Sequence, residues 1–386
     1  MKFRFLTSGE SHGKCLNAIV EGLPAGVRID EEFINSELAQ RQSGYGRGER
    51  MQIEKDCVII NSGVRFSYST GAPICVEIAN KDFINWEIPM SVSTVDMTNL
   101  ETAQKVNEKK ITKVRPGHAD LAGALKYNHK DIRDILERSS ARETAARVAV
   151  GAIAKSLLKE LKIEITSHVI QIGSVRRSGF NPTINDVGLK PDLLFEEQTK
   201  AEIDKAAAVG TTLGGKFEVV IHNAPVGLGS HVHWDRKLDG KLAQAIMSIN
   251  AVKSVSFGNG ENAACLSGAE FQDEIFYENN RFVRKTNNAG GIEGGMSNGE
   301  DIVIKGVMKP IPTMKAPLAS VDIETKTAYK AHFERADVCA VSACAIVAEA
   351  MAAIIIADEI LQKFGGDSIS ELKTHLSNYV NYCESF

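Results

Sequence analysis

The sequence has little of several features that mark specialised proteins, and each shortage excludes a class of function. Its 386 residues include only seven cysteines, with no Cys-x-x-Cys pair, which excludes a disulfide scaffold and favours a reducing compartment. Aromatic residues make up only 6%, too few for platforms on which nucleic-acid bases stack. The net charge of −4 leaves no basic excess, so the sequence predicts no general binding of nucleic acid.

Long hydrophobic runs are also scarce. The N-terminus turns polar after Leu6 and lacks the apolar stretch of a secretory signal peptide. Residues 338–357 form a long run that is apolar or small except for Glu349. Because an acidic residue in mid-helix costs about 2.5–3.5 kcal/mol on membrane insertion, we expect a helix buried between protein layers. The sequence therefore predicts a cytoplasmic protein that makes no contact with a membrane.

What the sequence does contain is a mixture of strand and helix patterns. Strands are predicted at 3–6, 56–60, 70–78, 163–172, 216–222 and 301–307. Helices are predicted at 140–161, 197–208, 237–249 and 338–361. Ser140 and Glu143 match a capping box at the start of the first helix. Residues 81–112 are polar and irregular, which predicts a loop over a site or a partner subunit.

No linker rich in proline or serine divides the chain. Small residues on the two longest predicted helices allow close packing and allow sheets to lie over them. We therefore expect an α+β fold, in which long central helices are sandwiched between mostly antiparallel sheets. The fold would be a single large domain over residues 1–365, followed by a loosely attached C-terminal tail at 366–386.

The first candidate site is Gly9-Glu10-Ser11-His12-Gly13, which satisfies the Gly-x-Ser-x-Gly pattern of serine hydrolases. That pattern needs a strand–turn–helix context, and here it lies at the extreme N-terminus, before any parallel sheet could form. A hydrolase with Ser11 as its nucleophile is therefore a weak interpretation. A glycine-flanked turn with a packed histidine is the plain structural alternative.

The second candidate is a set of arginines in turns rich in glycine or serine. Two of these arginines, Arg138 and Arg142, flank the serines at a predicted helix start. Exposed N–H groups and the helix dipole already favour an anion at such a place. Taken singly, each arginine reads as a surface charge, but together in an acidic protein they predict a site for a small polyanion. The set, with one neighbouring histidine, is Arg41, Arg47, Arg115, His118, Arg138 and Arg142.

A third segment, at 287–299, is rich in glycine and would let the backbone approach a flat or charged ligand closely. It does not follow the Gly-x-Gly-x-x-Gly pattern, and the chain has no phosphate-binding Walker motif, so a nucleotide loop is unsupported. A flexible linker is the alternative. His231 and His233 could form a metal pair, but no third ligand is near, so no metal site is predicted.

Together these segments resemble the chorismate synthase family, from the N-terminus to about Leu361. The resemblance is carried by short motifs in the family's order: 9–13, 44–48, 115–120, 138–145, 247–253, 289–295 and Lys309-Pro310. It implies a lyase of the shikimate pathway, active in aromatic amino acid biosynthesis. Such an enzyme converts 5-enolpyruvylshikimate 3-phosphate to chorismate by anti-1,4-elimination of phosphate. The family needs reduced FMN without net redox change, with NADPH as a possible reductant, and is usually a homotetramer.

The resemblance also implies roles for residues. His12 and His118 would be acid–base residues, and Asp337 would assist the last proton removal near the flavin. Substrate or NADP would be bound by Arg41, Arg47, Arg115 and Arg142. Flavin contacts would come from Arg138, Ser139, Ser140, Asn250, Ala251, Gly294, Lys309, Pro310, Ile311, Pro312, Thr313 and Arg335.

Three segments depart from the family's pattern. The usual Arg-His-Asp-Pro-Cys is Arg-Ala-Asp-Val-Cys at 335–339, and an Asp-Ser pair is replaced by Thr211-Thr212. A histidine before Ala-Gly-Gly is replaced by Asn288. These changes cluster on the expected flavin side and predict altered flavin affinity or slower turnover. A flavin- or anion-binding homologue without catalysis is the alternative function.

Overall fold

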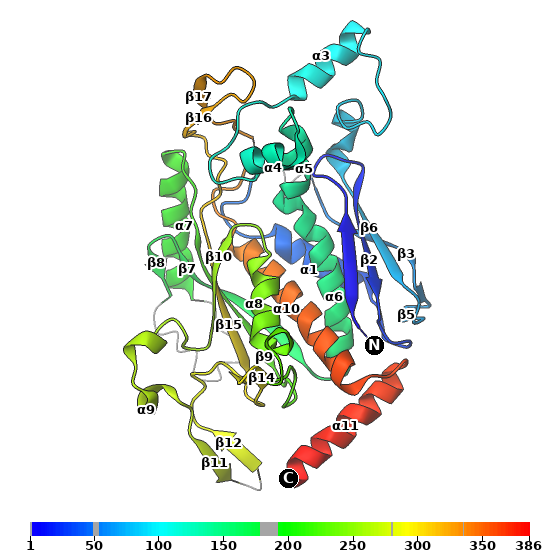
Figure 1. Ribbon diagram of the computed structural model, residues 1–386, viewed down its shortest axis with the longest axis vertical. Coiled ribbons are helices and arrows are strands. Elements are labelled where there is room, and N and C mark those ends of the chain that lie inside the picture. Colours follow the sequence, from blue (N-terminus) through cyan, green and yellow to red (C-terminus); the bar gives the residue numbers. More distant parts are fainter. Residues whose placement is uncertain (1, 49–53, 178–191, 279–280, 335) are drawn as a thin grey trace.

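The computed structural model describes residues 2–48, 54–177, 192–278, 281–334 and 336–386, and it shows helices between two antiparallel sheets (Figure 1). The first sheet has the strand order β1-β2-β6-β3. Its strands alternate between buried and more exposed side chains, as expected of a sheet with one face on a core. They are β1 (Arg4–Ser8), β2 (Cys15–Glu21), β6 (Ile74–Ala79) and β3 (Val58–Ser62).

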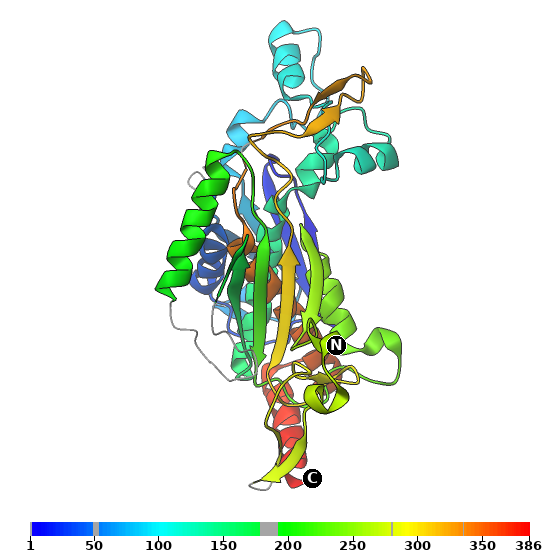
Figure 2. The ribbon, with the colours of Figure 1, turned by 90° about the vertical axis from the view of Figure 1, so that its left-hand side faces the viewer.

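The second sheet has the order β10-β15-β9-β7-β8, again with every neighbouring pair antiparallel. One face of its central strand is fully buried through Phe217, Val219 and Ile221. Figure 2 shows the strands of this sheet from its outer face, with the helices behind them. They are β10 (Val252–Phe257), β15 (Ile302–Met308), β9 (Gly215–His222), β7 (Glu164–Ile172) and β8 (Val175–Arg176).

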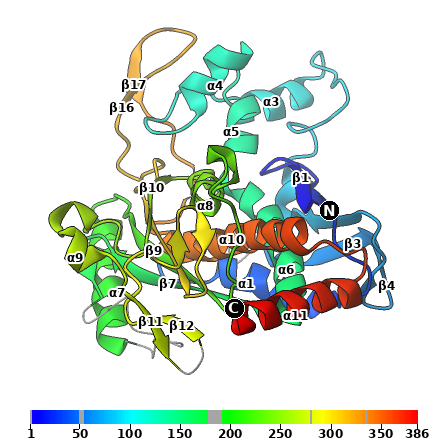
Figure 3. The same cartoon turned by 60° about the horizontal axis from the view of Figure 1, so that its bottom comes forward.

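The layer between the sheets is made of α1 (Glu31–Gln42), α6 (Thr144–Glu160), α8 (Leu238–Met247) and α10 (Val341–Phe364). Figure 3 shows α10 crossing the molecule between them. A Cβ added at Gly151 of α6 would lie 2.3 Å from the Cβ of Ala350 of α10, so only glycine permits this close approach. Small residues thus let the two longest buried helices pack backbone to backbone.

Among the described residues, α10 is also the helix long and apolar enough to cross a membrane. In the structure, 78% of its most apolar window is buried by protein. It packs on α6 and α1 on one side and on β7 and β9 on the other. The predicted burial between protein layers is therefore confirmed.

One end of the sandwich is capped by short elements that surround a small separate core (Figure 1). That core contains Ile111, Val114, Ala124, Ile132 and Leu136. The capping elements are the 3₁₀ helix η1 (Lys81–Asn85), α3 (Leu100–Lys109), α4 (Asp120–Tyr127), α5 (Arg133–Ser139), β16 (Ala319–Val321) and β17 (Ala328–Lys330).

The remaining elements lie around the edges. They are β4 (Val64–Arg65), β5 (Tyr68–Ser69), α7 (Leu193–Ala208), α9 (Gly268–Phe271), β11 (Ile275–Glu278), β12 (Arg281–Arg284), β13 (Ile292–Glu293), β14 (Met296–Ser297) and α11 (Ile369–Ser385). The predicted tail contains α11, whose side chain Leu372 is fully buried and whose first backbone N–H donates to the carbonyl oxygen of Ala25 at 2.9 Å.

The predicted α+β sandwich is confirmed, but two local predictions were wrong. Residues 81–112 are not one irregular loop, because α3 forms within them under an Asn99 cap. At 140–143 the capping box is incomplete: the Ser140 hydroxyl accepts from the backbone N–H of Arg142, while Glu143 pairs with Arg147. A 3₁₀ turn at Ala141–Glu143 shortens the first turn and moves the start of α6 to Thr144.

Candidate functional site

The turn between β1 and β2 presents His12 at the capped end of the first sheet. The carboxylate of Glu137, on α5, accepts from the backbone N–H of His12 at 2.7 Å and lies 2.8 Å from its ring nitrogen Nδ1. The backbone N–H of Ser11 donates to the carbonyl oxygen of Glu137. Three contacts thus fix the turn to α5.

The His12 ring is also held from its face. It stacks on Trp86 with ring centroids 4.0 Å apart. The guanidinium of Arg133 lies 4.9 Å from the Trp86 ring and donates to Glu137. Arg133 also pairs with Glu334 at 2.9 Å. The position of His12 is therefore determined before any ligand arrives.

His118 occupies a similar setting in the segment that leads into α4. Its Nδ1 lies 2.5 Å from Oδ1 of Asp120, which is fully buried. Arg115 donates to the same carboxylate through its backbone N–H, Nε and Nη2. Its Nη1 donates to the hydroxyl of Thr313 at 3.1 Å. This group joins the Arg-Pro-Gly-His segment to the predicted flavin segment.

The three carboxylates in these groups are stabilised as anions. Burial raises the pKa of Asp120, but hydrogen bonds from His118 and Arg115 outweigh it and hold the pKa well below its usual range. The same balance of burial against His12 and Arg133 lowers the pKa of Glu137. Burial opposed by His332 and Arg133 leaves the pKa of Glu334 at about 2.

Arg41 and Arg142 share one buried carboxylate. Asp56 has no exposed side-chain surface and contacts Arg41 at 2.8 Å and Arg142 at 2.5 Å. Arg142 Nε donates to Oδ1 of Asn80, whose amide nitrogen donates to the carbonyl oxygen of Gly13 beside His12. Nη2 of Arg142 is buried and makes no hydrogen bond among the described residues, although the carboxylate of Glu54 lies 4.0 Å from it. A buried cationic donor in this state favours an anionic ligand.

Arg47 joins this group. Burial lowers the pKa of Arg41, and the positive charges of Arg142 and Arg47 add to that effect against the attraction of Asp56. Arg47 lies 3.2 Å from Asp337, whose other oxygen accepts from the backbone N–H of Gly48. The predicted acidic residue is thus held by the predicted arginine loop.

The predicted flavin residues form a continuous line along the same end of the molecule. Arg138 donates to the carbonyl oxygens of Thr7 and Gly9, and the amide of Asn250 donates to the carbonyl oxygen of Ser139 at 3.1 Å. The backbone N–H of Lys309 donates to the carbonyl oxygen of Ala251 at 2.9 Å. This line reaches from the His12 turn to the start of segment 309–313.

Lys309 closes the line onto the second histidine. Its ammonium donates to the carbonyl oxygen of Gly117, next to His118. Burial lowers the pKa of Lys309, and the ammonium of Lys253 lowers it further. Two close ammonium groups near Arg115 form a place where an anion would relieve mutual repulsion.

The structure therefore brings most of the predicted residues together. One described residue lies apart from the others. Gly294 lies in the turn between β13 and β14, beside Leu238 at the start of α8, whereas Asn250 follows the end of that ten-residue helix, about 15 Å away along its axis. Arg335 lies outside the described residues. Pro310, Ile311 and Pro312 lie within the segment that Lys309 and Thr313 anchor.

Two of the three departures make hydrogen bonds through the substituted side chains, and one of these bonds reaches the site. The hydroxyl of Thr212 donates to the carbonyl oxygen of Ile311 at 2.7 Å and so holds segment 309–313. Asn288 accepts from the amide of Asn259 at 3.2 Å, in the turn that follows β10. Both substitutes therefore make hydrogen bonds in their new positions.

Several residues of the site were not predicted. Asp120 lies inside the motif at 115–120, and Glu137 directly precedes the motif at 138–145, so an acidic residue two positions after His118 or just before Arg138 was an available signal. Asp56, Asn80 and Trp86 gave none, since each lies in a segment with no motif. Only the three-dimensional contacts reveal them.

The hydrolase geometry does not form. Ser11 lies in the turn of an antiparallel hairpin, not between a strand and a helix, and it is only 2% exposed. A nucleophile elbow must present its serine at the surface of the site.

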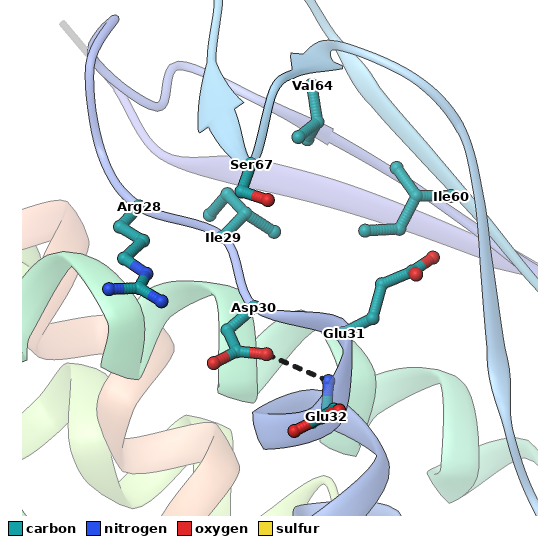
Figure 4. A pocket seen from close by; sticks show the side chains of 8 residues that line it. All are labelled: Arg28, Ile29, Asp30, Glu31, Glu32, Ile60, Val64 and Ser67. Carbon is teal, nitrogen blue, oxygen red and sulfur yellow. Dashed lines mark hydrogen bonds between the residues drawn. The ribbon is translucent and has the colours of Figure 1, made fainter.

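A pocket of about 490 Å³ lies elsewhere, between the start of α1 and strands β3 and β4 (Figure 4). Carboxylates from Asp30, Glu31 and Glu32 line it beside Arg28, and Asp30 accepts from the backbone N–H of Glu32 at 3.0 Å. This acidic lining does not suit a polyanion, and no predicted site residue lies there.

Comparisons with known proteins agree with the motifs. The family described as "Chorismate synthase" matches residues 3–361. Proteins named chorismate synthase are 53% identical over 99% of this chain in Thermoanaerobacter pseudethanolicus and 54% identical over 99% in Caldanaerobacter subterraneus, each matched over its whole length. A crystal structure of chorismate synthase covers 100% of this chain and 99% of its own, with 40% identity and a TM-score of 0.80. The chain therefore belongs to the chorismate synthase family of enzymes.

Proposed function

We propose that this lyase of the shikimate pathway eliminates phosphate from 5-enolpyruvylshikimate 3-phosphate in the anti-1,4 sense, giving chorismate, and that it depends on reduced FMN. The observation that carries the proposal is the convergence of five arginines, Arg41, Arg47, Arg115, Arg138 and Arg142, and two carboxylate-paired histidines at one end of the sandwich. Their sequence positions range from 12 to 142, so only the fold brings them together.

The charge distribution supports a substrate with several anionic groups. The substrate carries one phosphate and two carboxylates, which would repel each other strongly unless cations separated them. Arg41, Arg47 and Arg142 form one group of guanidinium groups, paired with Asp56, Asp337 and, at 4.0 Å, Glu54. Nη2 of Arg142 makes no hydrogen bond among the described residues and so offers a buried donor to an anion. Arg115 and Lys309 form another, beside His118. The two groups suit the carboxylates and the leaving phosphate.

The two histidines suit acid–base work at neutral pH. His118 lies between Arg115 and the Lys309 segment, where a proton donated to the departing phosphate would help it leave. His12 lies on the flavin side, beside the loop that Arg138 holds. Asp337 pairs with Arg47 at 3.2 Å and would assist the last proton removal.

The residues present fit a flavin. Asn250 has a buried Oδ1 with no hydrogen-bond donor among the described residues, as a ring N–H would require. Ala251 has φ of +68°. Ser139 is the last residue of α5, and Ser140 caps that helix at its C-terminal end. The chemistry supplied by bound reduced FMN would be the transient loan of an electron, returned by the end of the reaction, so that phosphate leaves without net oxidation. Asn250, Arg138 and segment 309–313 would hold it, and NADPH is its proposed reductant.

We also propose a cytoplasmic homotetramer. The seven cysteines are all free thiols, as a reducing compartment would keep them. The outer face of the first sheet exposes Leu6, Ile19 and Ile59, with 73%, 48% and 50% of their surfaces accessible. Burying such residues against another subunit would be favourable.

An anaerobic assay tests the proposal. Purified protein is mixed with reduced FMN and substrate, and released phosphate is measured against a control without protein. Phosphate and chorismate should appear in equal amounts, and only with reduced FMN. Flavin binding without phosphate release would favour the non-catalytic homologue, and release without flavin would refute the cofactor dependence.

The replacement of His118 tests the assigned acid. We expect His118→Ala to lower kcat by about 10²–10⁴-fold, the usual contribution of a positioned acid or base, while flavin binding is retained. Flavin fluorescence quenching measures the binding, and the phosphate assay measures kcat. Equal loss of flavin binding and activity would show that His118 is structural.

A further inference from the structure

The two histidines share one arrangement that the motifs do not show. In each, Nδ1 faces a carboxylate: Glu137 at 2.8 Å for His12, and Asp120 at 2.5 Å for His118. Both carboxylates are almost fully buried, with 2% and 0% of their side chains exposed, whereas the two imidazoles keep 13% and 16%. Each ring therefore has one nitrogen turned inward and an edge that remains accessible.

We propose that Glu137 and Asp120 are positioning residues that hold a proton on Nδ1 of His12 and of His118, so that Nε2 is the nitrogen that exchanges protons with the reactants. The inference rests on the proposed function and deepens it. An ionised carboxylate can only accept hydrogen bonds, so a ring nitrogen at these distances must be the donor. The opposite tautomer would place two lone pairs against each other. The depressed pKa of each carboxyl group supports its ionised state.

Glu137 holds His12 through both of its oxygens. Oε2 accepts from the backbone N–H of His12, while Oε1 accepts from Nδ1 and from Arg133 Nη1. Backbone and ring are thus bound to one rigid group, and Trp86 fixes the ring plane from the side. Among the described residues, Nε2 of His12 makes no hydrogen bond, which leaves it available to a ligand.

Asp120 holds His118 in the same way. Its Oδ2 accepts from the backbone N–H and Nε of Arg115, and its Oδ1 accepts from Nη2 at 3.0 Å and from His118 Nδ1. Arg115 Nη2 lies 3.1 Å and 3.4 Å from the two ring nitrogens, so it does not approach along one lone pair. Asp120 is therefore the partner of Nδ1, and Arg115 secures Asp120.

Electrostatic interactions connect the group around His12 with the group around His118. Arg133, which pairs with Glu137, pairs with Glu334, and the positive charge of Arg115 helps to lower the pKa of Glu334. Glu334 thus interacts with both supporting arginines, with Arg133 through an ion pair and with Arg115 through its charge at longer range.

The test uses full-length protein labelled with ¹⁵N in its nine histidines. Long-range ¹H–¹⁵N spectra identify the protonated nitrogen of each neutral ring, and single His→Gln variants assign the signals. The wild type should show Nδ1–H for His12 and His118. In Glu137→Gln and Asp120→Asn, an amide nitrogen must replace one acceptor oxygen, so the corresponding ring should shift toward Nε2–H. We expect kcat to fall about 10²–10⁴-fold with KM changed only a few-fold.

A matched control exists outside the site. Nδ1 of His222 lies 2.9 Å from Asp301. This pair lies at the ends of β9 and β15 that are farther from the capped end of the sandwich. Asp301→Asn should alter the His222 signal alone and leave kcat unchanged. Glu137→Asp, which restores a carboxylate, should recover part of the activity, which also answers the objection that the Gln variant is misfolded.

Specific outcomes would overturn the inference. They are Nε2–H on either wild-type ring, unchanged tautomers in the amide variants, or a changed tautomer with full kcat. If the wild type releases no phosphate but shows Nδ1–H on both rings, the proposed reaction fails while the assignment of the tautomers stands. The spectra and the phosphate assay therefore separate the two claims.

Discussion

Asp56 shows how much of this site depends on one buried charge. It neutralises Arg41 and Arg142 at once and has no exposed side-chain surface. Removing one partner of a buried ion pair leaves an uncompensated charge, which is far more costly than losing a pair on the surface. Asp56 therefore supports both the cationic group and the fold around it.

We expect Asp56→Asn to lower the free energy of unfolding by about 3–5 kcal/mol, measured by urea denaturation. The control is the exposed pair of Arg4 and Glu21, in which Arg4→Ala should cost less than about 1 kcal/mol. Bound phosphate should stabilise Asp56→Asn more than the wild type, because it can replace the lost anion. Equal losses in the two variants would contradict this account.

At this scale the motifs predicted the cationic side chains and the imidazoles but not their partners. His118 and Arg115 occur in a recognisable turn, whereas Trp86 reaches His12 from a segment without any pattern. Arginine and histidine in glycine-rich turns carry a chemical signal of their own. The role of a carboxylate or an indole in the site can be recognised only from its contacts in the folded structure.

Across the second sheet, Glu218 creates a different kind of sensitivity. It lies on the strand face opposite Phe217 and opposes Lys305 and His168 on the neighbouring strands, yet it is only 2% exposed. Burial raises the pKa of Glu218 to about 7, and attraction to Lys305 only partly offsets it. Folded Glu218 thus keeps a proton that the unfolded chain has already released.

The consequence is a loss of stability with rising pH. Between pH 4.5, the ordinary value, and about pH 7, the folded state binds more protons than the unfolded state, so this residue makes the free energy of unfolding fall as pH rises. Glu218→Gln should flatten that fall, as measured by urea titrations across the window. The exposed Glu108→Gln should keep the wild-type slope, and an unchanged slope in Glu218→Gln would refute the assignment.

The contact between α6 and α10 depends on Gly151. An added methyl group would meet Ala350 at 2.3 Å. Although alanine is the better helix former by about 1 kcal/mol, we expect Gly151→Ala to destabilise by about 1–3 kcal/mol, because two buried helices must separate. At Gly240 of α8 the nearest atoms are 3.9 Å away, so Gly240→Ala should be neutral or stabilising. Thermal unfolding of both variants tests the opposite signs.

Elements with strong periodicity were predicted well, including β7, β9, α7 and α10. The helix α3 was missed because its residues are mostly polar and none is buried, so its few apolar residues were not recognised as a helical pattern. The start of α6 was misplaced by a 3₁₀ turn that the capping pattern does not reveal. The periodic spacing of apolar residues arises from the burial of one face, so it gives a weak signal where an element is exposed.

For the molecule as a whole, the net charge of −4 should weakly repel an anionic substrate. Binding must then depend on the local arginines, whose attraction salt screens over a length of about 10 Å at 0.1 M. We expect KM for the substrate to rise several-fold between 0.05 and 0.5 M NaCl, at nearly constant kcat. An uncharged osmolyte at matched osmolality serves as the control. A KM independent of salt would contradict an electrostatic site.

The burial of α10 between the two sheets has a consequence for how the protein is made. The backbone N–H of Phe3 donates to the carboxylate of Asp358 in α10. This contact of the N-terminal segment can therefore form only after α10 has been synthesised. At 5–20 residues per second, a ribosome needs roughly 20–70 s to reach the end of that helix. During this time the layer between the sheets lacks α10, and the apolar side chains of α6, β7 and β9 that pack on it have no partner there. The complete sandwich can therefore form only after α10 has been synthesised.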